Sequence, residues 1–284
     1  MKIALIADTH LTAAAGDFIA NCETAIAWID GIGADLVVHL GDITADGVED
    51  PAQFAVAHKV LSRLGTPLLL VPGNHDIGDN PTPGAGAAHG LVRPDRLALY
   101  RQTFGADYWV APAGDWSLIG LNAQLFGLGD AEEEAQFVWL EQTLAAVSGP
   151  IGLTLHKPLF RDAPEEGVVH PRYVPIAQRA RLLALFAGHD LRFVVNGHTH
   201  QLRRLRQAGV DHLWAPSCAF VVPDVMQEWI GDKVVGVMVV TLEDAGHRFA
   251  LHVLPGLAQY NLADYVDVFP KLRGILARAA DARA

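Results

Sequence analysis

Apolar runs and helix-like segments alternate along the first part of the chain. Runs at residues 3–7, 36–40 and 68–71 each predict a buried strand, because consecutive apolar side chains suit a strand covered on both faces. Between these runs, the residues expected on the inner face of a helix recur at helical spacing: Phe18, Cys22, Ile26 and Ile29, then Phe54, His58, Leu61 and Leu64. The order strand, helix, strand, helix, strand predicts a parallel sheet with covering helices.

The alternation continues to about residue 200 and then changes. Helices are expected at 94–104, 132–147 and 176–186, and strands at 116–122, 151–155 and 191–195. Beyond residue 200, strand-like runs follow one another without helices, at 201–208, 210–215, 234–242 and 248–254. This pattern predicts antiparallel strands that close a second sheet.

The last residues, 257–284, form a tail in which apolar side chains recur at helical spacing. They are Leu272, Ile275, Leu276 and Ala279, and we expect this helix to dock on its own domain. No linker, repeat or low-complexity tract interrupts the chain. Residues 1–284 are therefore predicted to form a single domain.

Polar side chains follow five of the predicted strands at the point where each strand ends. They are Asp8, His10, Asp42, Asn74, His156, His198 and His200. In open α/β sheets, ligands bind beyond the carboxyl ends of the strands. All seven side chains offer oxygen or imidazole nitrogen and none offers sulfur, which favours Mn, Fe, Zn or Co over a thiolate-bound metal.

The spacing of these residues indicates two metal ions. Residues two apart in an extended segment point to the same side, so Asp8 with His10, and His198 with His200, can each present two donors to one place. Seven ligands are too many for one ion, but they suit two ions if one carboxylate bridges them. Asp42 stands alone at its strand end and is the natural bridge.

The ordered set Asp8-x-His10, Gly41-Asp42, Gly73-Asn74-His75-Asp76, His156 and Gly197-His198-x-His200 resembles the calcineurin-like metallophosphoesterase superfamily. The resemblance implies an α/β fold, a four-layer α/β/β/α sandwich of two mixed β-sheets flanked by helices, with a dinuclear metal site at the strand ends. It implies that Asp8, His10, Asp42 and His200 bind the first metal, and that Asp42, Asn74, His156 and His198 bind the second. His75 matches the family's histidine that reaches the substrate without binding metal, so it is the candidate catalytic residue.

Within the superfamily, the motifs are similar to those of bacterial cyclic-nucleotide and glycerophosphodiester phosphodiesterases. Residues 100–121 and 137–144 also resemble the purple-acid-phosphatase-like branch. The expected function is hydrolysis of phosphodiester bonds in small soluble substrates by a metal-bridging hydroxide, because no Ser or Cys nucleophile is signalled. The alternatives are a phosphomonoesterase or protein phosphatase of the same superfamily, and an inactive scaffold, which lost ligands would mark.

The net charge and the composition limit which kinds of binding partner and which cellular location are expected. The formal net charge of −11 disfavours a nucleic-acid surface, and no apolar run is long enough to span a bilayer. The two cysteines, Cys22 and Cys218, lie far apart in the sequence and predict free thiols in a reducing compartment. The N-terminus runs directly into a strand, so a cytoplasmic location is expected, with a small phosphoester as partner and a homodimer left open.

Two predicted loops leave ligand-bearing strands directly: 77–92 follows Asn74, and 157–173 follows His156. The second loop holds Arg161 and Arg172, and arginine suits bidentate recognition of phosphate or carboxylate. Alternatively, both arginines pair with Asp162, Glu165 or Glu166. Asn74, His75 and Arg172 are the candidate substrate-binding residues.

Overall fold

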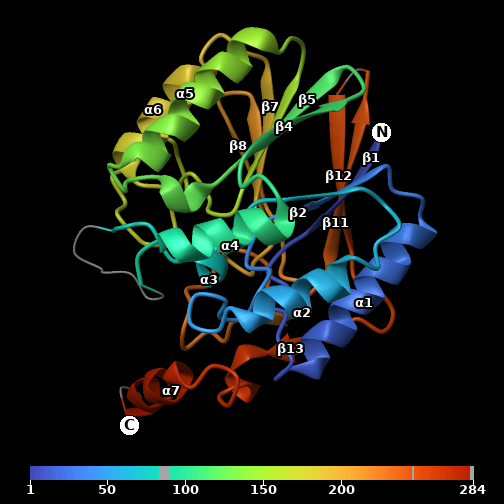
Figure 1. Ribbon diagram of the computed structural model, residues 1–284, viewed down its shortest axis with the longest axis vertical. Helices are drawn as coiled ribbons and strands as arrows, with labels where there is room; N and C mark the ends of the chain where they lie inside the picture. The colour runs from blue at the N-terminus through green and yellow to red at the C-terminus, as the bar shows by residue number, and fades with distance from the viewer. Residues whose placement is uncertain (83–89, 245, 282–284) are drawn as a thin grey trace.

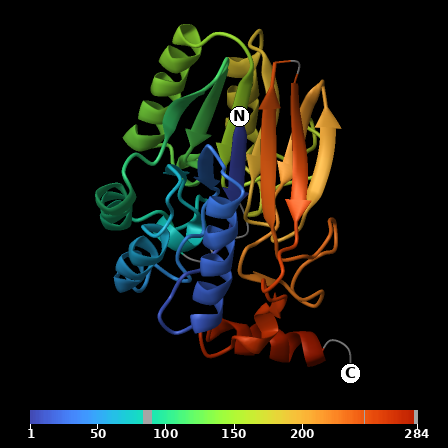
Figure 2. The same cartoon turned by 90° about the vertical axis from the view of Figure 1, so that its right-hand side faces the viewer.

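The fold is taken from a computed structural model that describes residues 1–82, 90–244 and 246–281. Four layers stack in the order helix, sheet, sheet, helix (Figures 1 and 2). The first sheet has the strand order β12-β11-β1-β2-β3. Its strands are β1 (Lys2–Ile6), β2 (Leu36–His39), β3 (Leu68–Leu70), β11 (Val237–Glu243) and β12 (Gly246–His252). β1, β2 and β3 are parallel, whereas β11 runs antiparallel to β1, and β12 runs antiparallel to β11.

The second sheet has the order β4-β5-β6-β7-β9-β8 and is also mixed. Its strands are β4 (Trp109–Ala113), β5 (Trp116–Leu121), β6 (Ile151–Leu155), β7 (Leu191–Asn196), β8 (Arg203–Gln207) and β9 (Val210–Trp214). β5, β6, β7 and β9 are parallel, and β4 and β8 close the two edges antiparallel. A short parallel pair, β10 (Phe220–Val221) with β13 (Tyr260–Asn261), lies apart from both sheets.

Helices cover the outer face of each sheet (Figure 1). The first sheet is covered by α1 (Gly16–Gly31), α2 (Ala52–Leu61) and α4 (Pro94–Phe104), and the second by α5 (Ala131–Ala146) and α6 (Ile176–Phe186). The remaining helices are α3 (Asn74–Ile77), α7 (Lys271–Asp281) and two 3-10 turns, Ala123–Leu125 and Leu262–Asp264. Figures 1 and 2 both place α7 at the end of the molecule opposite to α5.

Strand β1 shows why its sequence is apolar throughout. Ile3 and Leu5 pack between the two sheets, in a cluster that includes Trp116 and Phe193 of the second sheet. Ala4 and Ile6 point to the opposite face and pack under α1 and α2. Because successive side chains of a strand alternate between faces, a strand buried on both sides needs apolar residues at every position.

The structure confirms the predicted four layers and most of the predicted elements. One prediction on α2 is wrong: His58 is exposed, and Gln53, Phe54, Ala57, Val60 and Leu61 form the buried face. Strand β4 was not predicted, because Pro112 interrupts its pattern; at a sheet edge, a proline is tolerated. Part of the loop predicted at 77–92, residues 83–89, lies outside the described residues.

The strands beyond residue 200 do not form one antiparallel meander, so the prediction that they close a second sheet together is wrong. β11 and β12 extend the first sheet, whereas β9 joins the second sheet parallel to β7. An apolar pattern indicates a strand but not its partner, and the open edges of β1 and β7 decide the pairing. Among the described residues, no helix has the length and apolar character needed to cross a bilayer.

Candidate metal centre

The carboxyl ends of strands from both sheets meet at one place, and all seven predicted ligands lie there. β1, β2 and β3 of the first sheet lead to Asp8, Asp42 and Asn74, while β6 and β7 of the second lead to His156 and His198. Backbone hydrogen bonds extend the pairing of β1 with β2 into the loops: Asp8 N donates to Gly41 O, and His10 N to Asp42 O. The site therefore lies on the seam between the two sheets.

Donor atoms of Asp8, His10 and His200 form the first group, with all ligand atoms within 4.8 Å of one another. His10 Nε2 and His200 Nε2 are 3.2 Å apart, and His200 Nε2 is 3.5 Å from Asp8 Oδ1. All three side chains are at least 95% buried, since His200, the most accessible, is 5% exposed. Buried imidazole and carboxylate donors that converge this closely suit a shared cation.

The second group surrounds His156 Nε2. This nitrogen is 3.1 Å from Asn74 Oδ1, 3.0 Å from His198 Nδ1 and 3.3 Å from Asp42 Oδ2. One ring N–H can donate to only one of these three atoms. Their convergence is what a bound cation requires of its ligands.

Asp42 lies between the two groups. Its Oδ2 is 3.3 Å from His156 Nε2 and 3.9 Å from His10 Nε2. Its other oxygen, Oδ1, accepts a hydrogen bond from the backbone N–H of His75 at 2.9 Å. One carboxylate oxygen is thus held by the backbone, while the other faces both groups.

The spacing of the donors fits metal coordination. Ligand atoms about 2.0–2.2 Å from one ion, in tetrahedral or octahedral geometry, lie about 3.0–3.5 Å from each other. The separations around His156 and those linking His10, His200 and Asp8 fall between 3.0 and 3.5 Å. The residues present therefore fit two ions.

Five of the candidate ligands adopt a left-handed backbone conformation that side chains other than glycine rarely take. Asp8, His10, Asp42, His198 and His200 have φ between +46° and +66°. Such conformations cost about 1–3 kcal/mol each and cluster at functional sites, where the surrounding structure holds them. Only one other non-glycine residue in the described ranges, Ala208, has a positive φ. The strain is therefore concentrated on the ligands.

Glycines precede three of the ligands because another ligand lies against each. A Cβ on Gly41 would be 2.6 Å from His156 Nδ1, and one on Gly197 would be 2.6 Å from Asp8 Oδ2. A Cβ on Gly73 would overlap the carboxylate and the backbone N of Asp42. Any side chain at these positions would push two candidate ligands apart.

Hydrogen bonds aim the imidazoles at the centre. His156 Nδ1 lies 2.8 Å from Leu40 O, and His200 Nδ1 lies 2.9 Å from Phe220 O. A ring that donates its Nδ1–H to a carbonyl turns the lone pair of Nε2 to the other side, here toward the donor groups. His10 Nδ1 is buried and has no hydrogen-bond partner among the described residues.

Burial shapes the pKa values of the histidines. It lowers the pKa of His10 and His198 well below the usual value and that of His200 to about 4, which keeps these rings neutral and able to bind metal. Burial also lowers the pKa of His156, but the nearby carboxylates of Asp42 and Asp8 outweigh it and raise the value to about 9. A metal ion at His156 would replace that proton.

The two carboxylates differ. Burial raises the pKa of Asp8 well above its usual value, with a further contribution from the charge of Asp42. For Asp42, burial acts in the same direction, but the imidazoles of His156, His75 and His10 together hold its pKa well below the usual range. Asp42 is the carboxylate that stays ionised most readily, as a bridging ligand requires.

His75 has a ring nitrogen within 4.8 Å of donor atoms of both His10 and Asp42, but it does not belong to the group around His156. Its Nδ1 is 2.6 Å from Ala45 O, and its ring meets the ring of His10 edge to face at 4.6 Å between centroids. Its side chain lines the same pocket as the candidate ligands. This position lets His75 reach a substrate held at the ligands.

The structure also shows supporting residues near the ligands. His39 lies between Thr9 Oγ1, at 2.9 Å from its Nε2, and Gly41 N, which donates to its Nδ1. Asp76 was not assigned a role from sequence, yet it accepts hydrogen bonds from the backbones of Ile43, Thr44 and Gly73. Asp76 thereby connects the Asp42 loop to the Asn74 loop. Its position three residues after Gly73 matches the spacing of a helix-capping box, and this spacing could have indicated its role from the sequence.

A buried lysine was missed from the sequence. Lys157 directly follows His156, is fully buried, and its ammonium group contacts Asp79 Oδ1 and Asn80 Oδ1. Asn80 in turn donates to Phe126 O at 3.0 Å. These contacts fasten the start of the 77–92 loop to the end of β6, next to the candidate ligands.

The arginines of the 157–173 loop behave differently from each other. Arg161 pairs with Asp162 at 3.2 Å and with Glu228 at 2.7 Å, so the predicted pairing with Asp162 is confirmed and Glu228 is an unforeseen partner. Arg172 is half-buried. Burial lowers the pKa of His198 most, followed by the charges of His156 and Lys157, and the charge of Arg172 makes a smaller contribution in the same direction. Arg172 does not line the pocket that opens on the candidate ligands.

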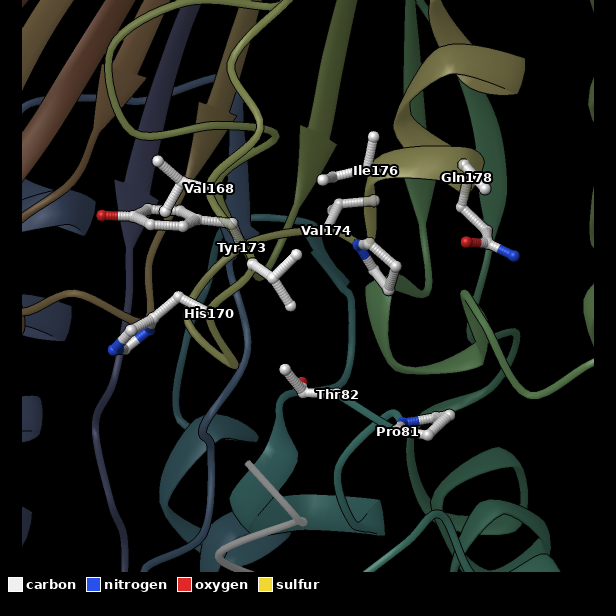
Figure 3. Close-up of a pocket in the computed structure, with 11 residues that line it drawn as sticks. Pro81, Thr82, Val168, His170, Tyr173, Val174, Ile176 and Gln178 are labelled. Atoms are coloured by element: carbon white, nitrogen blue, oxygen red, sulfur yellow. The ribbon is translucent and has the colours of Figure 1, made fainter. Parts of the chain in front are cut away.

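Residues of both loops line a small apolar pocket. Figure 3 shows Pro81 and Thr82 on one side of it, with Val168, His170 and Tyr173 on the other. None of the candidate ligands lines this pocket. The two loops therefore face each other here across a pocket that is separate from the donor atoms.

The larger pocket, of about 490 Å³, opens directly on the candidate ligands. Its lining residues fall into two chemical sets. The first set, which we call the ligand wall, consists of His10, Asp42, Asn74, His75, His198 and His200. The second set, which we call the apolar wall, consists of Phe220, Val222, Met226, Leu262, Phe269, Leu272 and Ile275. The sequence did not suggest that the tail would reach this site.

Comparison with known proteins agrees with this geometry. Residues 1–202 match the model of the calcineurin-like phosphoesterase family. The chain belongs to this family. Membership accounts for the ordered motifs between Asp8 and His200, which lie within the matched residues.

Relatives with different names share this family. The chain is 31% identical over 202 residues to a zebrafish (Danio rerio) serine/threonine-protein phosphatase CPPED1, a match that covers 68% of this chain and 58% of the relative. It is 26% identical over 241 residues to a probable cyclic nucleotide phosphodiesterase of Synechococcus, covering 81% of this chain and 86% of that protein. The crystal structure of a dimetal phosphatase from Danio rerio has the same fold, with a TM-score of 0.62 at 15% identity over 88% of this chain and 98% of that one.

Proposed function

We propose that the chain is a dinuclear metal-dependent phosphodiesterase that acts on small substrates. The observation that carries the proposal is the position of Asp42 Oδ2, 3.3 Å from His156 Nε2 and 3.9 Å from His10 Nε2, between two groups of donors. Asp8, His10, Asp42 and His200 would hold one ion, and Asp42, Asn74, His156 and His198 the other. In such a site, two divalent ions would supply Lewis acidity toward a phosphoryl oxygen and would lower the pKa of water toward neutral pH.

The chain's own residues supply the rest of the reaction. The strained loops of Asp8, Asp42 and His198 hold the donors in place before substrate arrives, which avoids reorganisation during reaction. Asn74 provides a neutral oxygen, so the site keeps more positive charge for an anionic substrate than a third carboxylate would leave. His75, beside the donors, would bind a phosphoryl oxygen or donate a proton to the leaving alkoxide.

Support for a diester comes from the relatives. The match to the probable cyclic nucleotide phosphodiesterase extends over most of both chains, whereas the match to the phosphatase spans 58% of that relative. A phosphomonoesterase or protein phosphatase is the second candidate, favoured by the higher identity, 31%, to the phosphatase. An inactive scaffold is disfavoured because all seven candidate ligands converge.

A panel of p-nitrophenyl esters tests the proposal. The protein, reconstituted separately with Mn²⁺, Fe²⁺, Co²⁺ and Zn²⁺, should bind about two ions per chain by elemental analysis. It should hydrolyse bis(p-nitrophenyl) phosphate with a higher kcat/KM than p-nitrophenyl phosphate. The reverse preference identifies a monoesterase, and two bound ions without hydrolysis of either ester identify a scaffold.

A further inference from the structure

The pocket that opens on the candidate ligands has two walls of opposite chemistry. Apart from the candidate residues, the only charged side chains among its lining residues that the structure describes are Asp46 and Lys271. Its volume, about 490 Å³, is within the range of small-molecule sites, about 300–1,000 Å³, and exceeds what a phosphate group needs. The remaining space is therefore bordered mostly by carbon.

The apolar wall lies directly against the histidines of the first donor group. The ring of Phe220 is 4.8 Å from the ring of His10 and 4.7 Å from that of His200, between centroids. Phe269 meets His10 at 6.0 Å and His75 at 6.2 Å, both edge to face. A group attached to a phosphate at the donors would leave the ligand wall next to these rings.

Several side chains of the apolar wall are incompletely buried. Val222, Met226, Phe269 and Ile275 are each half-buried, although aliphatic and aromatic side chains in a folded protein gain free energy from full burial. Phe269 and Ile275 belong to the segment around α7, whose Leu272 anchors it in a cluster with Phe18 and Phe220. The wall is thus fixed to the protein body on one side and available to a ligand on the other.

We propose that this site selects phosphoesters with an apolar substituent, an alkyl or aryl group, which packs on the apolar wall while the phosphoryl group lies at the ligand wall. The proposal rests on the function proposed above and narrows its substrate class. The tail that supplies Phe269, Leu272 and Ile275 lies beyond residue 202, outside the part shared with the family model. The selecting residues therefore belong to this chain rather than to the family's common motifs.

Two diesters with the same leaving group test the proposal: methyl p-nitrophenyl phosphate and hexyl p-nitrophenyl phosphate. Hydrolysis of either one consumes water, breaks the same P–O bond and releases p-nitrophenolate, leaving methyl or hexyl phosphate. With the Mn²⁺-loaded protein, kcat/KM for the hexyl ester should exceed that for the methyl ester at least roughly tenfold, since burial of two methylenes suffices for that gain.

A binding measurement separates recognition from turnover. Calorimetric titration of the Mn²⁺-loaded protein should show tighter binding of hexylphosphonate than of methylphosphonate. The hexyl compound should also bind with a more negative heat-capacity change, the mark of buried apolar surface. Neither phosphonate has an ester bond to hydrolyse.

A matched pair of variants on α7 locates the contact. Ile275→Gln, which places an amide in the apolar wall, should reduce the hexyl-to-methyl ratio of kcat/KM about fivefold or more. Leu276→Gln alters the next residue of the same helix, also half-buried but not part of the pocket lining, and should leave that ratio as in the wild type. Circular dichroism and thermal unfolding of both variants check that the overall fold is retained.

The outcomes separate this inference from the proposed function. Equal turnover of the two esters and equal binding of the two phosphonates overturn the apolar substrate class and leave a phosphodiesterase. A ratio that Ile275→Gln and Leu276→Gln lower equally also overturns it. A preference for hexylphosphonate without hydrolysis of any ester overturns the proposed function and retains the apolar binding site.

Discussion

The two walls of the large pocket are built in opposite ways. On the ligand wall, His10, Asp42, His198 and His200 have left-handed backbones. The glycines that precede three ligands stand where a Cβ would overlap another ligand. On the apolar wall, Val222, Phe269 and Ile275 are half-buried and take part through carbon contacts alone. Metal coordination requires atoms placed to within a few tenths of an ångström, whereas apolar contact is non-directional and tolerates variation.

The two walls also come from different parts of the chain, and we expect them to have different roles. The ligand wall comes from residues 10–200 and lies inside the match to the family, 1–202. The apolar wall comes from residues 220–275 and lies outside it. The reaction type is thus carried by the shared part of the chain, and we expect substrate choice to depend on the part beyond it.

The largest expected effect is at Asp42, which faces both donor groups. Asp42→Ala should release both ions and lower kcat/KM by roughly 10³-fold or more, because a catalytic metal stabilises transition-state charge by several kcal/mol. His10→Ala should mainly weaken one ion. Elemental analysis with kinetics checks both, and Asp46→Ala, a pocket carboxylate outside the donor groups, should retain both ions. Retention of two ions by Asp42→Ala would remove its bridging role.

The next effect concerns His75, the member of the ligand wall expected to act on substrate. His75→Ala should keep the metal content and lower kcat by about 10²–10⁴-fold, the usual contribution of general acid–base catalysis. The loss should be greater for alkoxide leaving groups than for p-nitrophenolate, which departs without a proton. His170→Ala, in the 157–173 loop, serves as the histidine control. If His75→Ala lowers kcat equally for all leaving groups, His75 stabilises charge on the phosphoryl group and does not act as a general acid.

A smaller effect is expected from the glycines that keep the ligand wall tight. Gly197→Ala places a methyl group 2.6 Å from Asp8 Oδ2 and should weaken metal affinity by about 10–100-fold, as changes to groups that position ligands usually do. Gly31→Ala has open space around its Cβ and should leave affinity unchanged. Metal titration measures both variants. Unaltered affinity in Gly197→Ala would show that the ligand wall yields more readily than its geometry indicates.

The smallest effect is expected from Arg172, which the lining of neither wall includes. Arg172→Ala should raise KM roughly tenfold for a diester with a remote carboxylate, in line with the loss of one charge-assisted hydrogen bond. It should hardly change hydrolysis of bis(p-nitrophenyl) phosphate, whose second group is uncharged. Arg161→Ala, paired with Glu228, is the control. Equal losses on both substrates would place Arg172 at the phosphoryl group itself.

The candidate ligands and the layers could be predicted from the order of residues along the chain. Asp8, Asp42, Asn74 and His156 each follow an apolar run, and the position where a buried strand ends is a local property that can be read along the chain. Parallel strands bring their carboxyl ends to one edge, so the convergence of these residues followed from the order of elements. His58 was misplaced because the small Ala57 and the β-branched Val60 completed the buried face of α2.

Which distant segments contact each other could not be predicted and was seen first in the folded chain. The ammonium group of Lys157 contacts Asp79 and Asn80, and the ring of Phe269 meets the ring of His10 edge to face. Nothing in the sequence spacing of these residues indicates either contact. The return of residues 220–275 across the candidate ligands depends on β11 pairing with β1 and on Leu272 packing beside Phe18. Periodicity reports which face of an element is buried, whereas the identity of its partner is set by the packing of the whole core.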